Sequence, residues 1–209
     1  LAGALADPAA KLFWALALAL AVGLFALRPE FLNFDEYSFW GTAAKLTSET
    51  GALYTVCDTG LPWQMTELAA LPLASFFFQL FGSFAPWRAI FAADLLLLAA
   101  VAAAAGCAKK ARLAGPLFLA GLTVPTLVTV AGHTALLNTS WLEFLGDLPA
   151  GMLFGGAVAF WLAAKEQGPA ARWLTLPVLL LAANVKSNTF VLGLAAAGLV
   201  ALDAALFAA

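Results

Sequence analysis

The chain has 209 residues, of which 64% are hydrophobic and only 11% are charged, and its mean hydropathy is +0.95. Soluble domains contain about 45–50% apolar and about 25% charged residues, so the composition excludes an ordinary soluble protein and indicates an integral membrane protein. The net charge of −2 offers no basic surface for a nucleic acid, which we therefore exclude as a partner. Cys57 and Cys107 have neither metal-ligand nor disulfide-framework spacing.

Seven apolar segments are candidates for membrane-crossing helices, at about 12–28, 68–85, 87–107, 113–132, 148–164, 173–185 and 190–209. If all seven crossed, the basic clusters at 108–112 and 165–172 would lie on the side opposite Lys11, against the positive-inside rule. If 67–82 instead lies along the surface, six of the ten Lys and Arg residues become cytoplasmic: Lys11, Lys109, Lys110, Arg112, Lys165 and Arg172. We predict an all-α membrane protein with about six crossing helices and a cytoplasmic amino terminus; seven crossings are the alternative.

The segment 67–82 has the features of a helix that lies on the membrane surface. Pro72 interrupts it and Gly82 ends it, so its uninterrupted part is short for a hydrocarbon core of about 30 Å. Its aromatic face suits the interface and contains Phe76, Phe77, Phe78 and Phe81.

Two larger regions then face outward, the first external loop (29–86) and the second external loop (133–147). Lys186, between the last two spans, lies on the same side. Eight of the twelve acidic residues also lie there: Glu30, Asp35, Glu36, Glu49, Asp58, Glu67, Glu143 and Asp147. The polar chemistry is therefore expected on one face of the membrane.

The stretch "FDEYSFWGTAAKL", which begins at Phe34, predicts a second surface-lying helix. Asn33 and Glu36 have the spacing of a capping box, and the helix would run to about Thr50 and stop at Gly51. One stripe at helical spacing contains Phe34, Tyr37, Trp40 and Ala44, as expected of an amphipathic helix in the interfacial belt.

The adjacent acids Asp35 and Glu36 have two interpretations. Either acid could stabilise the helix start through the helix dipole, by about 0.3–1 kcal/mol. This explains Glu36 well, but it explains Asp35 less well, because Asp35 lies between Phe34 and Glu36 beside lipid. Asp35 is therefore the stronger candidate for chemistry.

The order of these motifs resembles the GT-C glycosyltransferases, the multi-span enzymes that include protein O-mannosyltransferases and the lipid A aminoarabinose transferase. "NFDEYSFWGTAAKL" resembles the start of their first external loop, and "GLPWQMTELAALPLASFFFQLFG" with "SFAPWRAIF" resembles their second juxtamembrane helix and the Arg before span two. "LNTSWLEFLGDLPAGMLFG" is similar through Asp147, and "LLLAANVKSNTFVLGL" through Lys186. Later spans and an external domain do not follow, so we expect residues 1–209 to be a GT-C-like module of a longer chain.

The resemblance implies an inverting hexosyl or pentosyl transfer from a polyprenyl-phosphate sugar to an acceptor glycan, lipid or protein. The active face would be the outer face of a bacterial cytoplasmic membrane. Asp35 is implied as the base that takes the acceptor proton. The leaving phosphate needs cationic or hydrogen-bonding partners, because its charge grows as the bond breaks.

The candidate substrate and phosphate ligands are Lys186, Arg88, His133, Glu36 and Asp147. Lys186 lies in an otherwise apolar stretch, where an ionisable residue suggests function, whereas Arg88 could simply extend to the interface. Three roles are open for Asp147: orienting the acceptor, binding a divalent ion (Mg²⁺ or Mn²⁺) together with Asp35, or capping the next helix, in which Pro149 lies near the start.

Two other classes of protein fit the same composition. A transporter or lipid flippase could use Asp94, Lys186 and Asp203 as an ion path, although the sequence has no internal repeat. A catalytically inactive membrane scaffold could keep the fold and bind a partner. Release of a lipid phosphate from a polyprenyl-phosphate sugar would distinguish the enzyme from both.

Overall fold

The computed structural model describes residues 6–57, 68–108, 110–132, 141–165, 173 and 175–206, and all regular elements in these ranges are helical. The short elements η1 and η2 are a π-helix and a 3-10 helix, and η4 is a second 3-10 helix. In chain order the elements are α2 (Pro8–Leu27), η1 (Glu36–Trp40), α3 (Gly41–Thr50), η2 (Tyr54–Val56), α4 (Ala70–Gln79), α5 (Pro86–Gly106), η4 (Ala111–Leu113), α6 (Ala114–Gly132), α7 (Asp147–Ala164), α9 (Thr175–Ala183) and α10 (Ser187–Leu206).

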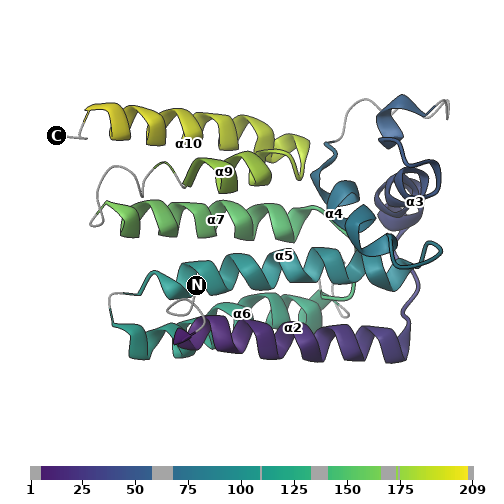
Figure 1. The fold of residues 1–209 in the computed structure, drawn as a ribbon, viewed down its shortest axis with the longest axis horizontal. Helices are drawn as coiled ribbons and strands as arrows, with labels where there is room; N and C mark the ends of the chain where they lie inside the picture. Colours follow the sequence, from purple (N-terminus) through teal and green to yellow (C-terminus); the bar gives the residue numbers. More distant parts are fainter. Residues whose placement is uncertain are drawn as a thin grey trace.

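Six helices lie side by side in one bundle, and each runs opposite to the helix before it in the chain (Figure 1). α5 packs against α2, α6 and α7, and α9 lies between α7 and α10. Four of the six, α2, α5, α7 and α10, are long and apolar enough to cross a membrane. The chain is thus an integral membrane protein with an all-helical fold across the described residues. α6 has 19 residues and α9 has 9, and crossing by all six helices stays a prediction.

The helices α3 and α4 lie together at one end of the bundle, which we call the α3–α4 end (Figure 1). α4 has ten residues and is about 15 Å long, half of the hydrocarbon core that a spanning helix must cross. Its first amide, Ala70 N, donates to Asn184 O at 3.0 Å, so α4 begins against the turn between α9 and α10. Its outer face exposes Phe77, and Phe81, two residues after its end, is exposed as well.

Pro72 does not interrupt the helix, contrary to the sequence-based expectation, because it lies in the first turn of α4. Amides in the first turn of a helix have no intrahelical acceptor, so the missing N–H of proline costs nothing there. The helix also ends at Gln79, before Gly82. The Gln79 side-chain amide bonds the backbone of Ala85 twice, at 3.0 and 2.9 Å, and thereby fixes the turn into α5.

The helix that follows Asn33 contains η1 and α3 and comes first in the chain, so we call it the first surface helix; it begins with the predicted capping box. Asn33 Oδ1 accepts from Asp35 N at 2.9 Å, and Glu36 Oε2 accepts from Asn33 N at 2.8 Å. The helix stops at Gly51, as predicted, where a φ of 67° favours glycine.

The predicted apolar stripe of this helix is divided between two environments. Phe34 and Tyr37 are 79% and 60% exposed, whereas Trp40 and Ala44 are buried. The reason is the π-helical turn over 36–40, whose i→i+5 bonds rotate the later residues relative to the earlier ones. A regular 3.6-residue period therefore predicts the wrong environment for Trp40 and Ala44.

The two ends of the bundle differ in charge. The described part of the end away from α3 and α4 carries the basic residues Lys11, Lys110, Arg112 and Lys165, because they lie at the start of α2, between α5 and α6, and after α7. Asp203 is also at this end and forms an ion pair with Lys165 at 3.2 Å. Asp7, the N-cap of α2, lies there too. The α3–α4 end carries the basic residues Arg28, Lys45, Arg88 and Lys186 and a larger set of acids: Glu30, Asp35, Glu36, Glu49, Glu143 and Asp147.

Close packing at Gly41 gives a test of the fold. A Cβ atom at Gly41 would lie 2.3 Å from the Phe31 ring and 2.6 Å from Glu36 O, so we expect Gly41→Ala to lower the free energy of unfolding by about 1–3 kcal/mol. Gly155→Ala is the matched control, because nothing lies within 4 Å of its added methyl group, and it should be neutral or slightly stabilising. Denaturant unfolding in detergent measures both, and equal effects would contradict the packing of Phe31 on this helix.

Candidate functional site

The carboxylate of Glu36 joins two segments that are far apart in the sequence. Glu36 is 1% exposed, and its Oε2 accepts from Leu32 N and Asn33 N at 2.9 and 2.8 Å. Its Oε1 accepts from Phe144 N at 2.6 Å, a bond that spans 108 residues of sequence. Both oxygens are occupied by backbone donors, which is the arrangement of a structural acid and leaves little capacity for a substrate.

A second acid holds the same distant segment. Asp94, inside α5, is 3% exposed and accepts a backbone hydrogen bond from Leu142, whose φ of 71° is left-handed. The segment 142–144 is thus held by Asp94 at one residue and by Glu36 at another. Phe144 also stacks on Phe31, with 6.1 Å between ring centroids. These contacts fix the chain just before α7 begins.

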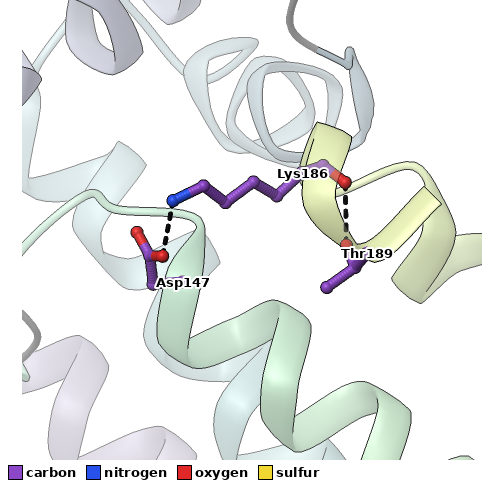
Figure 2. A network of polar contacts seen from close by, with 3 residues as sticks. All are labelled: Asp147, Lys186 and Thr189. Carbon is purple, nitrogen blue, oxygen red and sulfur yellow. Dashed lines mark hydrogen bonds and ion pairs between the residues drawn. The ribbon is translucent and has the colours of Figure 1, made fainter. Parts of the chain in front are cut away.

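Asp147 and Lys186 form an ion pair at the α3–α4 end of the bundle (Figure 2). Asp147 is the first residue of α7, and Lys186 is the residue before α10; their Oδ1 and Nζ atoms are 2.5 Å apart. The backbone of Lys186 is held in turn by the Thr189 hydroxyl, which donates to its carbonyl at 2.8 Å. The side chains are 22% (Lys186) and 47% (Asp147) exposed, so an anionic ligand could reach the lysine.

Asp35 differs from the adjacent Glu36 in both its exposure and its hydrogen bonding. Its backbone N–H is fixed by Asn33, but its carboxylate is exposed and makes no hydrogen bond or ion pair with the described residues. A carboxylate of this kind can accept a proton from a bound hydroxyl group. Asp35 therefore retains the chemical capacity that Glu36 has lost to backbone donors.

The remaining predicted ligands lie elsewhere or outside the described residues. Arg88 is in the first turn of α5, where it donates to Ser83 O at 3.0 Å and lies over the Trp87 ring. His133 lies outside the described residues. The structure thus pairs Asp147 with Lys186 and links Glu36 to the segment that leads to Asp147. Asp35, just before η1, and Arg88, in the first turn of α5, lie at the same end of the bundle.

No metal site is evident in the described part of the chain, where no group of three or more His, Cys, Asp and Glu residues is arranged to hold an ion. Binding of Mg²⁺ or Mn²⁺ by Asp35 and Asp147 stays a prediction. Sequence reasoning missed the contacts of Glu36 with Phe144 and of Asp94 with Leu142. The only available signal for the second was an acid within an apolar span, which is costly unless it has a partner.

Phe144 N is a third donor to the Glu36 carboxylate, so a Glu36→Gln variant should lose more stability than a capping box alone would predict. A glutamine could still complete the capping box, but its NH₂ group would then face the Phe144 N–H and leave a buried donor unpaired. We expect a loss of about 1–3 kcal/mol in the free energy of unfolding. The control is Glu49→Gln, since Glu49 is 54% exposed in a weak pair with Lys45 and should change stability by less than about 0.5 kcal/mol. Equal midpoints for the two variants in a denaturant titration would refute the structural role of Glu36.

Comparisons with known proteins do not identify the chain. No protein-family model, curated protein or solved structure matches it. The GT-C resemblance stays a prediction from short motifs, and any functional assignment depends on the residues and contacts described above.

Proposed function

We propose that the chain is a glycosyltransferase module of the GT-C type, which moves a sugar from a polyprenyl phosphate to an acceptor on the outer face of the membrane. The observation that supports this proposal best is the position of Asp35. Its carboxylate is exposed and makes no hydrogen bond or ion pair with the described residues, and hydrogen bonds fix the helix start that carries it. The buried Glu36 next to it fixes that start and also anchors the segment that leads to Asp147 and Lys186. An acid and a cation on one bundle end are the two groups that such a transfer needs.

In the proposed reaction, Asp35 takes the proton of the acceptor hydroxyl while the acceptor oxygen attacks the anomeric carbon of the sugar. The bond from that carbon to the phosphate oxygen breaks on the opposite face, and its electron pair leaves with the phosphate. Lys186 stabilises the growing negative charge, exchanging its contact with Asp147 for one with the phosphate. Attack from the opposite face inverts the configuration at the anomeric carbon.

The distribution of charge supports the proposed orientation with six crossing helices. Lys11, Lys110, Arg112 and Lys165 lie at the end away from α3 and α4, and Arg28, Lys45, Arg88 and Lys186 lie at the α3–α4 end. The excess that the positive-inside rule requires comes from the sequence, in which six of the ten Lys and Arg residues belong to the proposed cytoplasmic side. The α3–α4 end, with Asp35 and Asp147, would then face outward. In this arrangement α4 lies at the outer interface, where the exposed Phe77, and Phe81 just after the helix, would meet the boundary between headgroups and acyl chains.

A transporter is the second candidate, because Asp94 is buried within α5 and its Oδ2 has no hydrogen-bond partner among the described residues. The other two members of an ion path fit less well. Asp203 is engaged by Lys165 and by the Trp161 indole at 3.2 Å. Lys186 lies at the opposite end of α10, a helix of 20 residues and about 30 Å.

The two cysteines test the orientation without any added label site. Cys57 follows η2 at the α3–α4 end, and Cys107 follows α5 at the other end. A membrane-impermeant maleimide applied to intact cells should modify a Cys107→Ser variant, through Cys57, and leave a Cys57→Ser variant unmodified. Burial raises the pKa of the Cys107 thiol and lowers its thiolate fraction, so the permeabilised control needs longer exposure or a higher pH. Labelling of Cys107 from outside would overturn the orientation.

Asp35→Asn tests the catalytic assignment, because it preserves shape and removes the proton acceptor. With the protein in lipid nanodiscs, release of polyprenyl phosphate from a labelled polyprenyl-phosphate sugar should fall by about 10²–10⁴-fold. Glu30→Gln is the matched control, the corresponding change at an exposed acid in the same connection, and it should keep full turnover. Unchanged turnover in Asp35→Asn would return Asp35 to a helix-dipole role.

A further inference from the structure

An apolar groove of about 540 Å³ lies where α2, α4 and α5 meet at the α3–α4 end of the bundle. Its volume is in the range of about 300–1,000 Å³ typical of ligand pockets. Most of its wall is aromatic, and a single charged residue lines it: Phe25 from α2, Phe78 and Phe81 from α4 and its end, and Trp87, Phe91 and the charged Arg88 from α5. The groove is thus suited to a hydrocarbon chain that ends near a cation.

Two guanidinium groups flank the aromatic wall of the groove. The Arg88 Cζ lies 5.2 Å from the Trp87 ring centroid, and the Arg28 Cζ lies 5.3 Å from that of Phe25. These two rings contact each other edge to face, with 5.8 Å between centroids. Neither arginine forms an ion pair with a described carboxylate, and Arg88 uses one nitrogen to bond Ser83 O. Both retain donors for an anion, and guanidinium groups suit phosphate oxygens.

The position of these groups matches the headgroup layer of a bilayer. Arg28 is the residue after α2 and Arg88 is in the first turn of α5, two of the four helices long enough to cross a membrane. Trp87, the aromatic partner of Arg88, is of the type enriched at membrane interfaces. A hydrocarbon chain in the groove would therefore continue into the bilayer, with its phosphate at the depth of the two arginines.

We propose that this groove binds an anionic phospholipid, with the headgroup phosphate between Arg28 and Arg88 and an acyl chain along the aromatic wall. The two guanidinium groups beside an apolar, mostly aromatic wall favour an anionic lipid. Asp35, Asp147 and Lys186 do not line the groove, so the lipid held there is distinct from the sugar donor of the proposed reaction. The proposal therefore does not depend on the proposed function, and it assigns the phosphate contact of Arg88 to a bound lipid.

The backbone conformation of Arg28 suggests a substitution that should remove the guanidinium group and preserve the fold. Its φ of 47° is left-handed, a conformation that favours glycine, and the residue precedes Pro29, which disfavours it further. Its N–H caps the helix by bonding Leu24 O at 2.8 Å, a contact that any residue can make. Arg28→Gly should remove the guanidinium group while relaxing the backbone, so lost binding would not reflect lost folding.

The experiment is a fluorescence titration of the detergent-purified chain with phosphatidylglycerol that carries brominated acyl chains. Bromine quenches nearby indoles, and subtracting the signal of a Trp87→Phe variant isolates Trp87 in the groove wall. We expect half-quenching at a concentration at least about tenfold lower than with brominated phosphatidylcholine. Arg28→Gly and Arg88→Gln should each raise that concentration by about tenfold or more, whereas Arg112→Gln at the other end of the bundle should not.

Three results would overturn the proposal. Equal quenching by the two lipids would mean that the groove accepts any acyl chain, and no quenching of Trp87 would mean that lipid does not enter it. Displacement of phosphatidylglycerol by an equimolar polyprenyl phosphate would assign the groove to the sugar donor. Helical circular dichroism of each variant confirms that it is folded, so retained binding in a folded Arg28→Gly variant would count against the role of Arg28.

Discussion

The buried carboxylate of Glu36 is the contact on which the arrangement of the α3–α4 end depends. A buried polar group is tolerated only when its hydrogen bonds are complete, and here one side chain satisfies three backbone donors from two distant segments. Two of these donors precede the first surface helix, and the third precedes α7. One interaction thus determines where Asp35 lies and how the chain approaches Asp147.

The segment just before α7 connects the Glu36 contact to the ion pair of Asp147 and Lys186. Leu142 is bonded by Asp94 and Phe144 by Glu36, so the chain is held on both sides of Glu143 before it turns into α7. Gly146 then passes against the Trp40 ring, where an added Cβ atom would lie 2.8 Å from the indole. Asp147 follows directly and meets Lys186. The ion pair is therefore positioned by residues of η1 and α5 that do not touch it.

Local signals in the sequence predicted the local features well. The capping box of Asn33 and Glu36, the stop at Gly51 and the long apolar helices α2, α5, α7 and α10 all depend on neighbouring residues, and the structure confirms them. The π-helical turn was not predicted, because nothing in a 3.6-residue period signals an extra residue, and Trp40 was consequently assigned to the wrong environment.

Long-range contacts set the limit of the sequence-based prediction. Sequence patterns assigned Glu36 a place in a capping box, a helix-dipole effect of about 0.3–1 kcal/mol and a candidate role as a ligand. Its bond to Phe144 crosses 108 residues and has no local pattern. For the same reason the sequence predicted no contact for Asp94 with the segment before α7, and assigned it only a place in the alternative ion path. The predicted crossings already placed Asp147 and Lys186 on the same face of the membrane. That their side chains pair could not be predicted, because it depends on which helices are neighbours in the bundle.

The same end of the bundle carries two cationic sites with different surroundings. α2, α5 and the end of α4 line the aromatic groove beside Arg88, whereas the start of α7 and the residue before α10 bring Asp147 to Lys186. Lys186 already has a carboxylate partner and can exchange it, which suits a transient anion. The two arginines have aromatic rather than acidic neighbours, which suits an anion that stays bound. The short connection from Arg28 to Glu36 also contains Asp35. A lipid bound to Arg28 would therefore also restrict the segment that carries Asp35.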